Sequence, residues 1–326
     1  MRKHSLTALA FTTLSLASAL NAAAQTAANT PKLPRTSWGD PRIEGIYTNK
    51  DENGTPFERP NELAGKQRRE FGPEQMKELM VERTRRAQAG AARIGGSADN
   101  DTGAGPPHWY EHLDAVNSRP WFVSEPADGK VPATTDAARQ RAQARALPKR
   151  EAPDTYTDMS LYDRCITIGL PGSMMPMIYG NAYRITQSPG YVAIQYEMIH
   201  ETRVIPLGDA PRVASNLDFY MGEARGYFEG DTLVVETRNI RPQAAYRNAS
   251  EDLVITERFA PVDENTLSWE VRFEDPGTWT APWAFEMPLK RDAEAQPFEY
   301  ACHEGNLGLA NILSAARATD AERDKR

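Results

Sequence analysis

The feature that most restricts the fold of this chain is an alternation of apolar and polar residues in its second half. The segment 267–274 reads LSWEVRFE and the segment 283–289 reads WAFEMPL, so apolar side chains recur at alternate positions. A period of two is typical of β-strands that bury one face. Shorter runs of this kind recur from Tyr183 onward, separated by turn-forming stretches such as 229–231 and 275–277. The pattern predicts roughly eight to ten short strands.

An antiparallel meander of this kind closes into a barrel or folds as a sandwich. An open sheet of so many twisted strands leaves exposed edges, so the favoured fold is mainly β, with the meander closed into a barrel. The segment 191–205 is predicted as one long strand or as two strands joined by a bend. Phe298, Tyr300 and Cys302 predict a last strand, and the segment 306–317 predicts a C-terminal helix.

The first half of the chain has a different composition. Ala, Arg, Gln and Glu dominate from about residue 61 to residue 150, with too few β-branched and aromatic residues for an independent core. We expect a strand at 43–48, a helix at 74–93 that Pro73 opens, and a helix at 135–145. The predicted organisation is therefore a signal peptide at 1–24, an extended and helical arm with the first strand at 25–160, and a barrel-like domain with a C-terminal helix at 161–326.

The first 24 residues have the pattern of a cleavable secretory signal. Arg2 and Lys3 form a basic head, the stretch 6–20 is apolar or small, and residues 22–24 are all alanine. A membrane anchor is the weaker alternative, because Thr and Ser interrupt the stretch and a spanning helix needs about 20 apolar residues. We expect a periplasmic or secreted protein without a membrane span after signal removal. The net charge of −7 argues against a nucleic-acid partner.

The chain has two cysteines, Cys165 and Cys302. In an oxidising compartment the even number favours one disulfide that closes a long loop. The alternative is a pair of buried thiols or one reactive thiol. A disulfide would make Cys302 a poor candidate nucleophile.

Motifs of cofactor enzymes are absent from the sequence. It contains no G-x-G-x-x-G, P-loop or G-x-S-x-G string, so we expect no nucleotide cofactor and no Ser-His-Asp hydrolase. The segment 108–112 (HWYEH) matches the H-x-x-E-H string of inverted zinc proteases, but Pro120 would end such a helix early. Four other residues have side chains that can bind zinc, although no two of them have a diagnostic spacing. They are Glu197, His200, His303 and Glu304. We expect no metal.

Five stretches carry a resemblance to known proteins: 164–167 (RCIT), 197–200 (EMIH), 226–237 (GYFEGDTLVVET), 279–283 (WTAPW) and 300–306 (YACHEGN). In these stretches the chain resembles a family of exported bacterial proteins of unknown function, with weaker agreement at 108–111. The stretch 43–47 (IEGIY) is similar to the opening strand of lipocalin-like barrels. The resemblance implies an exported, lipocalin-like barrel and supplies no catalytic residue.

His200 is the first candidate for acid–base chemistry. If the long strand is continuous, His200 ends an apolar row, where a neutral imidazole can act as a base near neutral pH. On this reading Glu197, Glu201 and Arg203 lie on the opposite face, and only a bend would bring Glu197 to His200. The plainer alternative is a core or lid histidine satisfied by one backbone carbonyl.

His303 and Glu304 form the second candidate pair. They lie between the predicted last strand and the final helix, and strand ends often project side chains into a barrel mouth. A Cys165–Cys302 disulfide would hold them rigidly beside the 164 segment. The alternative is that Glu304 only caps the C-terminal helix.

Aromatic and basic residues of the strand region predict a binding cavity. Tyr179 and Tyr196 would line its walls, and Arg184 and Arg225 would pair with an acidic ligand group. The tyrosines are equally consistent with an ordinary core, and Arg225 with an ion pair to Glu223.

Together these residues suggest an enzyme that acts on a hydrophobic or aromatic small molecule by acid–base chemistry, of the lyase, hydratase or isomerase type. His200 would be the base, His303 and Arg225 would polarise the substrate, and Glu304 would be the acid or orienting partner, with Glu197 the second choice. The alternatives are a non-catalytic carrier of lipophilic ligands in the cell envelope, and a structural protein that binds through its Arg-rich helices.

Overall fold

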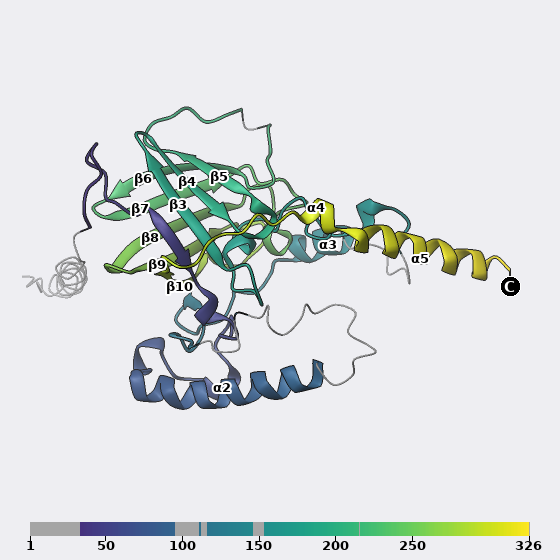
Figure 1. Ribbon diagram of the computed structural model, residues 1–326, viewed down its shortest axis with the longest axis horizontal. Helices are drawn as coiled ribbons and strands as arrows, with labels where there is room; N and C mark the ends of the chain where they lie inside the picture. The colour runs from purple at the N-terminus through teal and green to yellow at the C-terminus, as the bar shows by residue number, and fades with distance from the viewer. Residues whose placement is uncertain (1–32, 95–110, 112–115, 146–152, 215, 326) are drawn as a thin grey trace, which may run out of the picture.

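The chain folds around one antiparallel sheet that is nearly closed into a barrel (Figure 1). A computed structural model describes residues 33–94, 111, 116–145, 153–214 and 216–325. Within these residues, nine strands follow one another around the barrel in the order β5-β4-β3-β1-β10-β9-β8-β7-β6, and β2 pairs in addition with β10. The predicted antiparallel barrel is confirmed. The strands are β1 (Gly45–Thr48), β2 (Val123–Glu125), β3 (Ala182–Ser188), β4 (Tyr191–Tyr196), β5 (Thr202–Pro206), β6 (Glu223–Glu229), β7 (Thr232–Arg238), β8 (Val254–Asp263), β9 (Thr266–Glu274) and β10 (Trp283–Arg291).

The barrel comes closest to closing between β5 and β6. Leu207 and Gly226 form a parallel bridge there, and the amide of Gly208 donates to the carbonyl of Gly226 at 2.9 Å. A Cβ atom on Gly226 would lie 2.9 Å from the Leu207 side chain and 3.0 Å from that of Ile205. The missing side chain of Gly226 therefore allows the two edge strands to approach.

Aromatic side chains occupy the inside of the barrel. Trp269, Phe273, Trp283 and Phe285 are fully buried, and the rings of Phe273 and Trp283 stack with centroids 4.2 Å apart. All four lie in the segments whose alternation predicted strands, on the apolar side of β9 and β10. The period of two thus corresponds to an inner apolar and an outer polar face.

The first half of the chain supplies helices and also completes the sheet. β1 lies between β3 and β10. The helices predicted at 74–93 and 135–145 are present as α2 (Pro73–Ile94) and α3 (Asp136–Arg145). At the start of α3, the Thr135 hydroxyl accepts a hydrogen bond from the Ala138 amide at 3.1 Å, as expected for an N-cap. In Figure 1, α2 lies below the barrel.

The C-terminal segment leaves the barrel as a short helix, α4 (Cys302–Gly305), and a long one, α5 (Leu307–Arg323), which projects away from the body (Figure 1). The Asn306 side chain caps α5 by accepting a hydrogen bond from the Leu309 amide at 3.2 Å. The helix predicted at 306–317 is confirmed and extends further. None of the helices in the described ranges combines the length and the apolar character needed to cross a membrane.

Two expectations about strands are decided by the structure. The strand predicted through Phe298, Tyr300 and Cys302 is wrong, because Cys302 begins α4 and residues 292–301 have no regular secondary structure. These residues, the C-terminal strap, start beside β1, and β1 is already paired with β3 and β10, so it has no free edge for another strand. The segment 191–205 forms two strands, β4 and β5, joined by a bend.

Two other predicted features lie largely outside the residues that the structure describes. The signal peptide expected at 1–24 lies outside the described residues, and so does the HWYEH stretch apart from Glu111.

Candidate functional site

The bend between β4 and β5 decides where the predicted catalytic residues lie. Ile199 and His200 adopt left-handed backbone angles, with φ of 60° and 45°, and the chain forms a 3-10 turn at Met198–His200. The turn ends the inner row of β4 at Tyr196 and leaves the His200 side chain exposed. The expectation that His200 ends this apolar row is therefore wrong.

His200 and Glu197 both contact the C-terminal strap. The Nδ1 atom of His200 is hydrogen-bonded to the backbone carbonyl of Tyr300 at 2.7 Å. Glu197 accepts backbone hydrogen bonds from Ala182 and Phe298. Burial, and secondarily the charge of Glu111, raise the pKa of Glu197. The bend thus brings Glu197 and His200 to the strap, and both side chains bond to its main chain.

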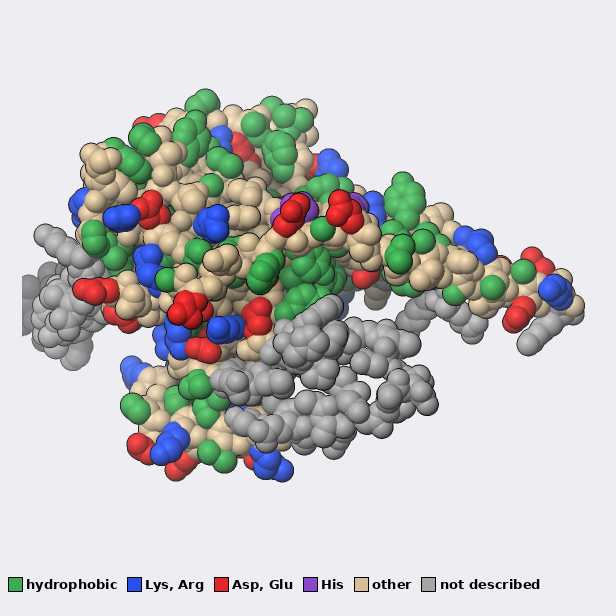
Figure 2. Space-filling model, in the orientation of Figure 1, with side chains coloured by type: hydrophobic (Ala, Val, Ile, Leu, Met, Phe, Trp, Pro, Cys, Tyr) green, Lys and Arg blue, Asp and Glu red, His purple; other side chains and the backbone are tan. Residues whose placement is uncertain are grey.

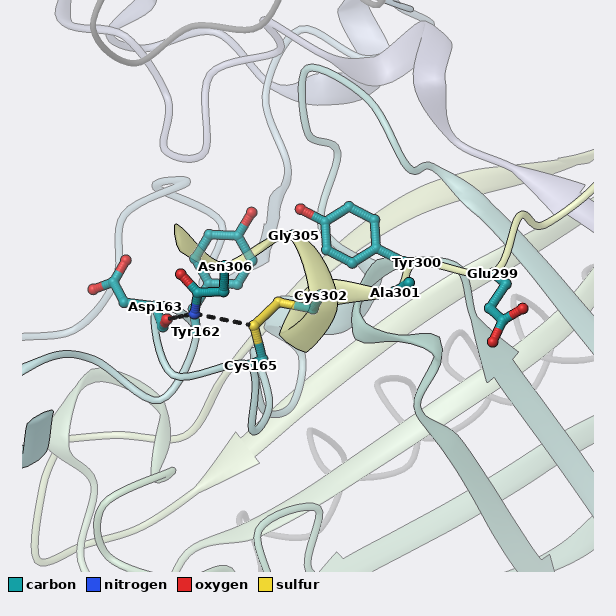
Figure 3. A pocket seen from close by; sticks show the side chains of 9 residues that line it. All are labelled: Tyr162, Asp163, Cys165, Glu299, Tyr300, Ala301, Cys302, Gly305 and Asn306. Atoms are coloured by element: carbon teal, nitrogen blue, oxygen red, sulfur yellow. Dashed lines mark hydrogen bonds between the residues drawn. A yellow bond between two sulfur atoms is a disulfide. The ribbon is translucent and has the colours of Figure 1, made fainter. Parts of the chain in front are cut away.

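The disulfide expected between Cys165 and Cys302 is present, with the two Cα atoms 5.7 Å apart. It fastens the strap and α4 to the 160–167 segment (Figure 3). The Asn306 amide adds a hydrogen bond to the backbone carbonyl of Asp163 at 2.8 Å. His303 and Glu304, which follow Cys302 in α4, are exposed. Figure 2 shows histidine side chains beside acidic ones on the surface around α4.

Three tyrosines pack beside the disulfide. Tyr162, Tyr179 and Tyr300 are joined by side-chain hydrogen bonds, and the rings of Tyr179 and Tyr300 stack with centroids 6.5 Å apart. Burial is the main cause that raises the pKa of Tyr179 to about 12. A cavity of about 400 Å³ is lined by Tyr162, Tyr300 and both cysteines (Figure 3). Tyr179 therefore packs against Tyr300 of the strap.

The two arginines expected to bind substrate lie on strands but on the outer face. Arg184 is exposed on β3. On β6, Arg225 forms an ion pair with Glu223 at 2.8 Å and donates to the backbone carbonyl of Ala210 at 3.1 Å. Arg225 therefore has the pairing with Glu223 that the sequence left as its alternative, although both side chains are largely buried.

A second cavity, of about 340 Å³, lies at the end of the barrel where β7 connects to β8. We call it the mouth pocket. The Tyr246 ring stacks on the inner residue Phe273 with centroids 5.2 Å apart, which joins the pocket to the aromatic core. The residues that give the pocket its chemistry are Leu161, Thr167, Ile168, Leu170, Tyr246 and Arg247.

Arg247 places a positive charge over the aromatic rings of the mouth pocket. Its guanidinium lies 4.7 Å from the ring centroid of Phe57, 5.4 Å from that of Tyr246 and 5.7 Å from that of Trp283. Cations within about 6 Å of an aromatic face are attracted by its quadrupole. These rings therefore hold the charge at the edge of the pocket.

One hydrogen-bonded pair of polar groups begins at the wall of the mouth pocket, and a second pair lies inside the barrel. The Thr167 hydroxyl donates to the Glu201 carboxylate at 2.7 Å. Two residues further on, Arg203 donates through Nη1 to Glu257 at 2.5 Å, with both side chains nearly fully buried. The Trp269 indole donates to the second oxygen of Glu257 at 3.1 Å. Burial raises the pKa of Glu201, while the Thr167 hydrogen bond and the Arg203 charge oppose the rise.

Tyr196 interacts electrostatically with Arg203, Glu257 and Glu201. It was expected to bind substrate, and it is fully buried in the barrel interior. Within the described part of the chain its hydroxyl has no hydrogen-bond partner, and neither do the Nε and Nη2 atoms of Arg203. We refer to Tyr196, Arg203 and Glu257, together with the half-buried Glu201, as the buried cluster.

Sequence reasoning missed three members of this cluster. Continuous alternation placed Glu201 and Arg203 on the outer face, whereas the bend after Tyr196 turns Arg203 inward. Glu257 carried a readable signal, because it occupies an inner position of the alternating run at 253–259 (LVITERF). A charged residue at such a position indicates a buried partner or a functional site.

Comparison with protein-family models, with curated proteins and with solved structures found no match. Among the residues that the structure describes, no group of three or more His, Cys, Asp or Glu side chains is arranged to hold a metal ion.

Proposed function

We propose that the protein binds a small molecule with an apolar or aromatic body in the mouth pocket. The observation that carries the proposal is the composition of this cavity of about 340 Å³. Leu161, Ile168 and Leu170 supply apolar walls, and Thr167 and Arg247 supply polar groups. Ligand sites are typically concave, mostly apolar and equipped with a few oriented polar groups. This combination supports the carrier function that the sequence offered as an alternative.

Acid–base catalysis by His200, Glu197, His303 and Glu304 remains a prediction. His200 and Glu197 contact the main chain of the strap, and His303 and Glu304 face solvent. The mouth pocket is lined by other residues, so binding is the function that its geometry favours. We further propose an extracytoplasmic location, which rests on the signal-like sequence at 1–24 and with which a disulfide is compatible.

The test is a titration with a neutral aromatic probe, 2-naphthalenemethanol, followed by fluorescence. Ile168→Trp fills the pocket and is expected to weaken binding at least about tenfold, a loss of about 1.4 kcal/mol. The matched control, Val204→Trp, adds the same side chain at an exposed position of β5 and should leave affinity within about twofold. Absence of saturable binding, or equal weakening by both variants, would contradict the proposal.

A further inference from the structure

We propose that the buried cluster recognises a carboxylate group of the bound molecule, so that the ligand is an apolar or aromatic monocarboxylate. The inference rests on the proposed function, because the mouth pocket would hold the apolar body of that ligand. It adds a chemical class of ligand and a recognition site inside the barrel.

The guanidinium of Arg203 presents two adjacent buried donors. Its Nη1 atom is bonded to Glu257, whereas the adjacent Nε and Nη2 atoms are buried and without a partner among the described residues. Nε and Nη2 form a fork that matches the two oxygens of a carboxylate. A buried donor pair of this kind is costly unless an acceptor meets it.

The same fork is used for carboxylates elsewhere in this protein. In Arg85, Nε and Nη2 donate to the two oxygens of Glu82 at 2.9 and 2.8 Å. In Arg238, the same two atoms donate to Glu236 at 2.9 and 3.3 Å. Arg203 differs from these two residues because it is buried and its fork holds no side chain from the described ranges.

Tyr196 supplies another buried donor. Its hydroxyl is fully buried and also has no partner in the described ranges. Burial raises the pKa of Tyr196, so the phenol keeps its proton and remains a donor. Arg203 and Tyr196 are close enough to influence each other electrostatically. The unmet groups are therefore donors, and an acceptor with two oxygens and a negative charge satisfies them best.

Thr167 links the mouth pocket to Glu201 of the buried cluster. Thr167 lines the pocket, and its hydroxyl is bonded to Glu201. Glu201 interacts electrostatically with both Arg203 and Tyr196. Arg203 and Glu257 neutralise each other, so an incoming carboxylate would be opposed mainly by Glu201. The Thr167 hydroxyl, which donates to Glu201 at 2.7 Å, disperses part of that negative charge.

The experiment compares three ligands that share one ring system: 2-naphthoate, 2-naphthamide and 2-naphthalenemethanol. Arg203→Lys retains a charge that can pair with Glu257 and removes the fork. We expect it to weaken 2-naphthoate binding about 30-fold and to change 2-naphthamide binding less than about threefold. Tyr196→Phe removes one hydroxyl and should weaken 2-naphthoate binding about fivefold. Arg238→Lys, a matched change of a fork at the surface, should have no effect.

The outcomes separate this inference from the proposed function. Equal affinity of the native protein for 2-naphthoate and 2-naphthamide would overturn the carboxylate site and leave pocket binding intact. Absence of saturable binding of all three ligands would overturn both. If Arg203→Lys does not fold, Tyr196→Phe decides the question, and its failure to discriminate between acid and amide would also overturn the site. A crystal structure with 2-naphthoate should place the carboxylate on Nε and Nη2 of Arg203; water alone at these atoms would contradict the inference.

Discussion

The protein gathers polar groups in two regions, and the regions differ in how those groups are satisfied. At the C-terminal strap, His200 and Glu197 bond to main-chain atoms, and His303 faces water. Inside the barrel, Arg203 holds Glu257 and keeps a donor edge without a partner among the described residues. Water satisfies an exposed group at little cost, whereas a buried group needs a partner. The ligand site proposed above therefore rests on the unmet buried donors and not on the exposed imidazoles.

The largest expected effect comes from removing one partner of the buried ion pair. Glu257→Ala leaves the Arg203 charge buried without its carboxylate, and we expect it to lower the free energy of unfolding by about 3–5 kcal/mol. The matched surface variant is Glu236→Ala, which removes a partly exposed partner of Arg212 and Arg238. It should cost less than about 1 kcal/mol. Urea unfolding followed by circular dichroism measures both losses. Equal losses would contradict the expected difference between the buried and the surface ion pair.

The features of the molecule also differ in how far the sequence predicts them. The alternation along 267–274 predicted β9 and its buried residues, because a regular strand converts sequence period directly into inner and outer faces. The even number of cysteines predicted the Cys165–Cys302 bond. The strand prediction depends on regular strand geometry. The disulfide prediction depends on the chemistry of two cysteines, whatever the path of the chain between them.

The buried cluster was not predictable in the same way. The reversal at Arg203 depends on the left-handed backbone of Ile199 and His200, a conformation that is rare for a β-branched residue such as Ile199. A bend of this kind shifts every following side chain to the other face. The partners Arg203 and Glu257 are also 54 positions apart, so only the closed barrel brings them together.

A smaller effect is expected from neutralising Glu201. A carboxyl group whose pKa is raised by folding makes the protein lose stability as the pH rises from the unfolded pKa through the folded pKa. Glu201→Gln removes the ionised form and keeps an acceptor for Thr167, so it should raise the free energy of unfolding slightly at pH 7. The gain should vanish below about pH 4, where the glutamate is protonated in both states.

Thermal unfolding between pH 4 and pH 8 measures this dependence. Glu264→Gln, at an exposed position of the β8–β9 turn, provides the control and should show no such trend. A loss of stability at pH 7 in Glu201→Gln would mean that the attraction of Glu201 to Arg203 outweighs the cost of its burial. An ionised Glu201 would then repel a bound carboxylate.

The smallest effect is expected where the sequence first suggested catalysis. His200→Ala removes one side-chain bond to the Tyr300 carbonyl, and His303→Ala shortens an exposed side chain. Together they should lower the free energy of unfolding by about 1 kcal/mol or less. Because neither residue lines the mouth pocket, 2-naphthoate affinity should stay within about twofold of the native value, as measured by the same fluorescence titration. A loss of affinity comparable to that of Arg203→Lys would contradict this expectation. It would mean that the strap and the barrel interior act as one site, and the acid–base role predicted for His200 would regain support.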